Sequence, residues 1–185
     1  MSSPVLILPG LGNSGPEHWQ SHWEHRDPGC VRVAQQEWDA PNRAEWVSTL
    51  AEAIARVTEP VVLVGHSTGC TLVAHWVAAT QTQPESARQF AAVRGALLVA
   101  PSDPTGLHYP PGPVGFAPVP LGRLPFPSIV VASTNDPYVT IERAREYASA
   151  WGASLIVLED AGHINVASGH GAWAEGFDLL AQLRS

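Results

Sequence analysis

The chain has 185 residues, of which 45% are hydrophobic and 15% are charged, and its formal net charge is −7. A chain of this size and balance can bury a substantial core, which excludes a disordered tail, a coiled coil and a disulfide-stapled mini-protein. We expect one domain over residues 1–185. The ten basic residues are all arginines and form no dense cluster, so a nucleic-acid-binding surface is not expected.

The N-terminal segment carries no basic region ahead of a long apolar run, and no apolar stretch reaches the roughly 18 residues of a membrane span. The sequence therefore predicts neither a signal peptide nor a membrane protein. Only Cys30 and Cys70 could form a disulfide, and two free thiols in a reducing cytoplasm are the simplest interpretation.

Short apolar runs alternate with helical patterns along the chain, which is typical of parallel strands joined by helices. Strands are predicted at residues 4–8, 31–34, 61–64, 96–99, 129–132 and 155–158. Helices are predicted at residues 17–25, 43–56, 68–80, 141–151 and 172–183. The expected fold class is α/β, a three-layer αβα sandwich with a mostly parallel sheet in the order 2-1-3-4-5-6.

The segment 101–127 breaks this pattern, because it holds nine of the seventeen prolines and four glycines. No regular helix or strand can persist at that density of proline and glycine. Its apolar residues argue against free disorder: Phe116, Leu121, Leu124 and Phe126. A long ordered loop inside a compact fold is usually functional, and this one lies where a helical lid would otherwise be inserted.

The sharpest local signal is Gly65-His66-Ser67-Thr68-Gly69, which follows one predicted strand directly and precedes a predicted helix. This context is typical of a nucleophile elbow, where a strained turn presents a serine hydroxyl at the edge of the sheet. Ser67 is therefore the candidate nucleophile, whereas a simple helix cap is the alternative.

A serine hydroxyl needs a base and an orienting acid, and both follow Ser67 in the order of a Ser-Asp-His triad. Asp136 comes directly after the strand predicted at 129–132, and His163 follows the last predicted strand. His163 is the candidate base, and Asp136 is the candidate for fixing its tautomer. His170 is an alternative base, although it is expected near the start of the last helix, and Glu159 and Asp160 are alternative acids.

The oxyanion of the reaction is expected to accept two backbone hydrogen bonds. One comes from the N–H of the residue after the nucleophile, and the other from an N–H in the loop after the first strand. Thr68 and Leu11 are the candidate donors. The loop around Leu11 is rich in glycine but lacks the third glycine of a dinucleotide fingerprint, and a chain without lysine cannot hold a Gly-Lys-Ser/Thr phosphate loop.

His18 and His22 lie four residues apart, a spacing that can bind zinc. No third ligand is evident nearby, so packing of the helix beside Trp19 and Trp23 is the preferred interpretation. His66 is expected to pack or hydrogen-bond locally. No metal site and no cofactor are predicted.

Five short motifs extend over nearly the whole chain: Pro9-Gly-Leu-Gly12, His18-Trp19, Gly65-His-Ser-Thr-Gly69, Asn135-Asp136 and Gly162-His163. Together they resemble the small α/β-hydrolase-like serine hydrolases, the family that includes retinoblastoma-binding protein 9. The resemblance implies a compact, lid-poor α/β-hydrolase fold that hydrolyses small esters or amides with Ser67, Asp136 and His163. Leu11 departs from the polar residue expected in some relatives, which affects a substrate contact more than a backbone donor.

The predicted function is hydrolysis of a small ester, thioester or amide through an acyl-enzyme, with Trp19 and Phe116 as candidate substrate contacts. Carboxylesterase-like and aminopeptidase-like action use the same residues and are left open, as is the oligomeric state. The alternative is a protein-interaction module on a hydrolase fold, motivated by the aromatic residues of segment 101–127. The Leu-x-Cys-x-Glu element for binding the retinoblastoma protein does not occur in the sequence.

Overall fold

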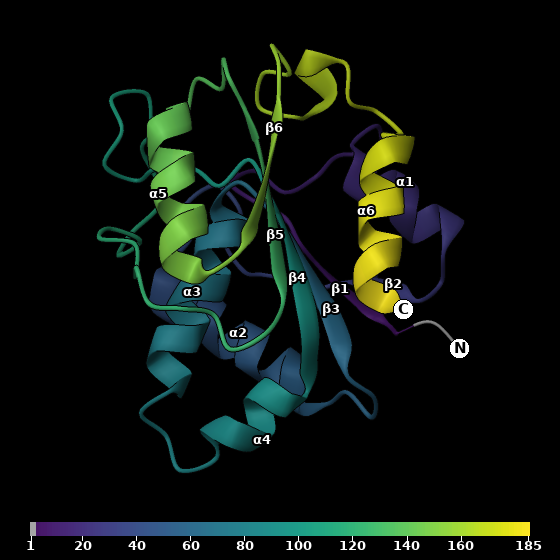
Figure 1. Ribbon diagram of the computed structural model, residues 1–185. Coiled ribbons are helices and arrows are strands. Elements are labelled where there is room, and N and C mark those ends of the chain that lie inside the picture. The colour runs from purple at the N-terminus through teal and green to yellow at the C-terminus, as the bar shows by residue number, and fades with distance from the viewer. Residues whose placement is uncertain (1–2) are drawn as a thin grey trace.

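A six-stranded parallel sheet lies between two layers of helices in the computed structural model, which describes residues 3–185 (Figure 1). The strands are β1 (Val5–Leu8), β2 (Cys30–Arg32), β3 (Val61–His66), β4 (Val93–Val99), β5 (Ser128–Ser133) and β6 (Ser154–Leu158). Their order is β2-β1-β3-β4-β5-β6, and each neighbouring pair is parallel. The predicted αβα architecture and strand order are therefore confirmed.

Helices cover both faces of the sheet. They are α1 (Trp19–Arg26), α2 (Arg43–Ala55), α3 (Thr68–Thr80), α4 (Ser86–Ala91), α5 (Ile141–Trp151) and α6 (Ala174–Arg184), with a 3-10 turn η1 (Val166–Ser168). Residues of α2, α3 and α5 form one core cluster with the sheet, and residues of α1 and α6 form the other (Figure 1).

The central strand β3 shows why its sequence is an unbroken apolar run. Leu63 packs into the cluster of α2, α3 and α5, whereas Val62 and Val64 pack into the cluster of α1 and α6. Because successive side chains point to opposite faces and both faces are covered, every position of such a strand must be apolar.

Helix boundaries differ from prediction where a local feature sets the end. α1 begins at Trp19 because His18 caps it, its side chain accepting from the Gln20 backbone N–H. α6 begins at Ala174 because Trp173 has a positive φ of 38° and cannot join the helix. The six-residue helix α4 was not predicted, because it has no buried residue and hence no apolar stripe.

The segment between β4 and β5 contains no helix, and its only strand-like contact is an isolated bridge between Asn42 and Val114. Phe116, Leu124 and Phe126 are buried in the core, while Leu121 is 45% exposed. The segment is therefore ordered by packing and forms no helical lid. Both phenylalanines are buried, so they offer no exposed aromatic surface for a partner protein.

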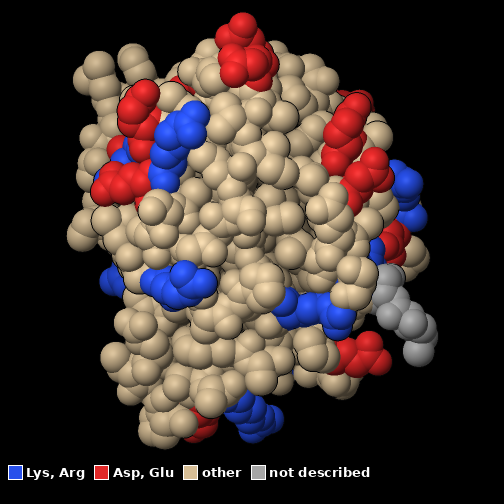
Figure 2. All heavy atoms as spheres, in the orientation of Figure 1, with Lys and Arg blue, Asp and Glu red and all other residues tan. Residues whose placement is uncertain are grey.

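Charged side chains are scattered on the surface. On the face drawn in Figure 2, the arginines lie apart from one another with uncharged surface between them. Cys30 and Cys70 are both free and buried. Within residues 3–185, no helix has the length and apolar character needed to cross a bilayer.

Candidate active site

Ser67 occupies the sharp turn between β3 and α3. Its backbone angles are φ 56° and ψ −122°, a conformation that side-chain-bearing residues rarely adopt. The Ser67 backbone N–H donates to the carbonyl oxygen of Val99 on the neighbouring strand at 3.0 Å. The surrounding sheet thus holds the serine in a strained turn, as an exposed nucleophile requires.

Two glycines make this turn possible. A Cβ atom on Gly65 would lie 2.9 Å from the backbone nitrogen of Cys70, and one on Gly69 would lie 2.1 Å from the carbonyl oxygen of Leu8. Neither contact could be relieved by a flexible side chain, since both involve backbone atoms. The Gly-x-Ser-x-Gly pattern therefore reflects close approach of α3 to the ends of β1 and β3.

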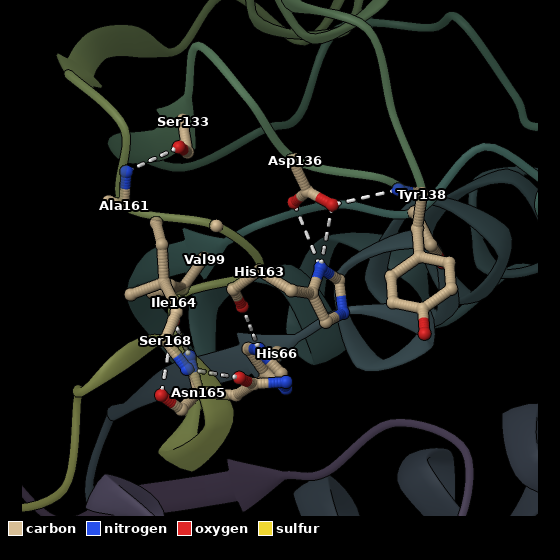
Figure 3. A network of polar contacts seen from close by, with 12 residues as sticks. His66, Val99, Ser133, Asp136, Tyr138, Ala161, His163, Ile164, Asn165 and Ser168 are labelled. Atoms are coloured by element: carbon tan, nitrogen blue, oxygen red, sulfur yellow. Dashed lines mark hydrogen bonds and ion pairs between the residues drawn. The ribbon is translucent and has the colours of Figure 1, made fainter.

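His163 and Asp136 form a buried pair beyond the ends of β5 and β6. The His163 Nδ1–H donates to Asp136 Oδ2 at 2.8 Å and to Oδ1 at 3.0 Å (Figure 3). The backbone N–H of Tyr138 donates to Asp136 Oδ1 at 2.9 Å, which fixes the carboxylate. Because Nδ1 faces Asp136, His163 Nε2 is the nitrogen left to act as a base.

The loop that carries His163 is held by side chains at the end of β5. Ser133 Oγ accepts from the Ala161 backbone N–H at 2.9 Å, as Figure 3 shows. Asn135 Oδ1 accepts from the Gly162 backbone N–H at 2.7 Å and from Ser133 Oγ at 2.9 Å. These bonds tie the loop of His163 to the end of β5 and so fix the position of the imidazole.

His66 also positions His163, a role that sequence analysis missed. The His66 Nε2–H donates to the carbonyl oxygen of His163 at 2.9 Å (Figure 3). Burial, followed by the nearby His163 and His18, holds the pKa of His66 well below its usual value. No sequence signal could have indicated this bond, because it joins residues 97 positions apart.

A cavity of about 200 Å³ brings the predicted residues together. Its walls are formed by Gly10, Leu11, Asn13, His18, His66, Ser67, Thr68, Ser102, Tyr109, Pro110, Tyr138, His163 and Asn165. Ser67 and His163 thus share one cavity. Within the described residues no hydrogen bond joins the Ser67 hydroxyl to His163, which is common for such pairs without bound substrate.

Two backbone amides at this cavity have no hydrogen-bond acceptor among residues 3–185. Thr68 is the first residue of α3, so its N–H has no intrahelical acceptor. The Leu11 N–H donates to no acceptor among residues 3–185. Both residues line the cavity beside Ser67.

Trp19 and Phe116 do not line this cavity, contrary to their prediction as substrate contacts. Trp19, the first residue of α1, is fully buried, and its Nε1–H donates to the Ile164 carbonyl oxygen at 2.9 Å. Phe116 is 1% exposed and packs on Trp46 and His75. Both rings are part of the hydrophobic core, and neither the sequence motifs nor the composition could indicate that burial.

The alternative acids and base lie elsewhere. Glu159 and Asp160 are exposed, and the carboxylate that contacts His163 is that of Asp136. His170 precedes α6, accepts from or donates to Ser168 Oγ at 3.2 Å and does not line the cavity. Within residues 3–185, no three metal-ligating side chains cluster, and His22 does not border the cavity with His18.

Comparisons with known proteins show the family and the fold. The family model described as serine hydrolase matches residues 5–182. A YdeN-like hydrolase from Pectobacterium atrosepticum is similar at 34% identity, covering 99% of this chain and 91% of its own, with a TM-score of 0.82. The ydeN gene product of B. subtilis is 20% identical over 98% of both chains, with a TM-score of 0.71.

More distant solved structures share the fold. The esterase RhEst1 from Rhodococcus sp. ECU1013 is 16% identical over 100% of this chain and 91% of its own, with a TM-score of 0.67. A search of the curated proteins gives no match. The resemblance inferred from the motifs is confirmed, and the chain belongs to the serine hydrolase family of α/β hydrolases.

Proposed function

We propose that this hydrolase cleaves small esters, thioesters or amides through an acyl-enzyme on Ser67. The observation that carries the proposal is the bidentate contact of His163 Nδ1 with buried Asp136, beside a serine held in a strained turn on the same cavity. Nucleophile, base and orienting acid are thereby supplied by three separate strand ends.

In the first half-reaction, the Ser67 oxygen attacks the scissile carbonyl while His163 Nε2 takes the hydroxyl proton. The resulting imidazolium is stabilised by Asp136 and then donates the proton to the leaving oxygen, sulfur or nitrogen. In the second half, His163 takes a proton from water, whose oxygen attacks the acyl carbon. The imidazolium then returns the proton to the Ser67 oxygen as its bond to the acyl carbon breaks and the acid leaves.

The backbone N–H groups of Leu11 and Thr68 are the proposed oxyanion donors. Both border the cavity and neither has an acceptor within the described part of the chain, so they can donate to the oxygen that becomes negative. The N-terminal end of α3 adds a favourable partial positive charge at the same place.

Ester substrates are favoured by the fold neighbours, which include the esterase from Rhodococcus sp. ECU1013. The cavity of about 200 Å³ is small beside typical ligand pockets of roughly 300–1,000 Å³, which favours short acyl groups.

Labelling with a fluorophosphonate probe tests the proposal, because such probes react with activated serines. The wild-type protein should be labelled, and Ser67→Ala should abolish labelling and lower p-nitrophenyl ester hydrolysis by at least about 10³-fold. Ser48→Ala, an exposed serine of α2, is the matched control and should be labelled normally. Equal labelling of Ser67→Ala and wild type would contradict the proposal.

A further inference from the structure

His18 borders the candidate cavity with its imidazole 94% shielded, since its exposed fraction is 6%. Its Nδ1 accepts a hydrogen bond from the Gln20 backbone N–H at 3.2 Å and so caps α1. Its ring lies 4.8 Å from the ring of His66. The residue is therefore fixed from two sides at the cavity wall.

The protonation of His18 follows from these contacts. A nitrogen that accepts from a backbone N–H carries no proton, and burial, followed by the nearby Arg32, lowers the pKa of His18 to about 4. At neutral pH the ring is thus uncharged with its proton on Nε2. Nε2 is buried and has no hydrogen-bond partner among residues 3–185.

Tyr109 presents a second such group from segment 101–127. Its hydroxyl lies near the side chains of Thr68 and Ser102, is buried, and makes no hydrogen bond among residues 3–185. Burial raises the pKa of Tyr109, so the hydroxyl keeps its proton and can donate. Tyr109 lines the same cavity as His18 and Ser67.

Buried donors without acceptors are costly, at about 1–3 kcal/mol each, so two of them at one cavity point to a ligand that supplies acceptors. The charge of that ligand is restricted. No arginine, aspartate or glutamate lines the cavity, and His18 and His66 are held uncharged. The third imidazole of the cavity, that of His163, is already paired with the carboxylate of Asp136. An anionic acceptor would lose its hydration there without gaining a counter-charge. An uncharged oxygen needs only the hydrogen bonds, so its desolvation costs much less.

We propose that His18 and Tyr109 are specificity-determining residues that donate hydrogen bonds to an uncharged oxygen on the acyl group of the substrate. The preferred substrates are then short esters or amides whose acyl chain carries an ether, hydroxyl or carbonyl oxygen close to the scissile bond. This inference rests on the proposed hydrolysis at Ser67 and adds the chemistry of the acyl group.

A pair of isosteric substrates tests the inference. In p-nitrophenyl methoxyacetate an ether oxygen replaces one methylene of p-nitrophenyl butyrate, so the two acyl groups differ in an acceptor and not in size. The ratio of kcat/KM for methoxyacetate to kcat/KM for butyrate is divided by the ratio of their hydroxide-catalysed rates. This corrected ratio no longer contains the difference in intrinsic reactivity between the two esters. Wild-type protein should favour methoxyacetate by about three- to tenfold after this correction. A carboxylated ester such as the hemisuccinate should be a poorer substrate than butyrate.

Two variants of His18 separate donation from helix capping. His18→Asn keeps an acceptor near the position of Nδ1 and so preserves the cap, but it lacks an atom at Nε2. His18→Gln places an amide nitrogen near Nε2 but loses the cap. The corrected ratio should fall toward one in His18→Asn and stay near the wild-type value in His18→Gln, whereas Tm should fall more in His18→Gln. His22→Asn, on the same helix but away from the cavity, is the matched control.

Tyr109→Phe provides an independent variant and should also lower the corrected ratio. The inference is overturned if His18→Asn and Tyr109→Phe hydrolyse both esters with the wild-type ratio, a result that would leave the proposed hydrolysis intact. Failure of the wild-type protein to hydrolyse either ester or to react with the fluorophosphonate would instead overturn the proposed function and the inference together.

Discussion

At Asp136 both carboxylate oxygens accept hydrogen bonds, one shared by Tyr138 and His163 and one from His163 alone. An amide in this place would offer an N–H to the ring, so Nδ1 would have to accept and the proton would move to Nε2. The imidazole could then no longer take its proposed role as a base toward Ser67. Orientation and tautomer are thus set by one residue.

Asp136→Asn should therefore lower kcat for p-nitrophenyl esters by about 10³- to 10⁴-fold while leaving the fold unchanged by circular dichroism. Asp160→Asn is the matched control, because Asp160 is exposed and has a positive φ of 49° that asparagine tolerates. A larger loss in Asp160→Asn than in Asp136→Asn would refute the assignment of the acid.

At the same scale, prediction from the sequence put Ser67, Asp136 and His163 at one edge of the sheet because each follows a recognisable strand, and His163 does contact Asp136 and share a cavity with Ser67. It misplaced Trp19 and Phe116 and overlooked the bond from His66 to His163. Strand ends determine where a residue lies on the sheet edge, whereas the direction of a ring depends on packing partners distant in the sequence.

The contact of α3 with β1 depends on one small residue. A glycine-to-alanine change within a helix ordinarily stabilises it by up to about 1 kcal/mol. At Gly69 the added methyl would lie 2.1 Å from the carbonyl oxygen of Leu8, so the helix would have to move.

Gly69→Ala should therefore lower the free energy of unfolding by about 1–3 kcal/mol, measured by urea denaturation. Gly122→Ala should change it by less than about 0.5 kcal/mol, because an added Cβ there meets nothing within 4 Å. Equal stability of the two variants would show that α3 can shift freely.

The loop after β1 is fixed from β2. The Arg32 side chain donates to Asn13 Oδ1 and the Ser14 carbonyl oxygen, both at 2.8 Å, and to Ser21 Oγ at 2.7 Å. It also pairs with Glu24. This network holds the loop that contains the Leu11 N–H.

Arg32→Lys keeps the charge but cannot make these divergent bonds. We expect kcat to fall roughly tenfold, less than the ~10²-fold or greater loss that follows removal of an oxyanion donor. Steady-state kinetics would measure this, with Arg56→Lys as control because its pair with Glu52 is exposed. An unchanged kcat in Arg32→Lys would show that the hydrogen bonds of Arg32 do not influence catalysis.

Among the elements, α3 and α5 were predicted at their observed bounds, since α3 follows a sharp turn and α5 ends at Gly152 in a left-handed conformation. The edge strand β2 was predicted one to two residues late, because one neighbour strand alone defines its length. The helix α4 was not predicted because it has no apolar face.

For the whole molecule, three buried histidines couple stability to pH. Burial lowers the pKa of His18, His66 and His75 in the folded protein, whereas in the unfolded chain they titrate near the ordinary value of 6.5. As pH falls below that value, the unfolded state binds protons that the folded state does not. The free energy of unfolding must therefore decrease on acidification.

Urea denaturation between pH 7.5 and about 4.5 should show this decrease, with a slope of up to about 1.4 kcal/mol per pH unit for each histidine. Asp27, whose pKa is lowered from 3.8 by its bond to Arg184, contributes at more acidic pH. His75 lies outside the candidate cavity, and His75→Gln should reduce the slope of the unfolding free energy against pH. His108 is exposed, so His108→Gln is the control and should leave that slope unchanged. A flat profile for the wild-type protein would contradict this linkage.

The order of the sheet also has a kinetic consequence. β6 is an edge strand that pairs with β5 alone, and the loop that follows it delivers His163 to Asp136 and Ser67. Refolding molecules that have completed β1 to β5 would already possess the serine turn and the carboxylate but would lack His163, the proposed base. With the proposed triad, return of hydrolase activity during refolding should therefore report the docking of the last strand, and it should not precede the recovery of helical signal from α3.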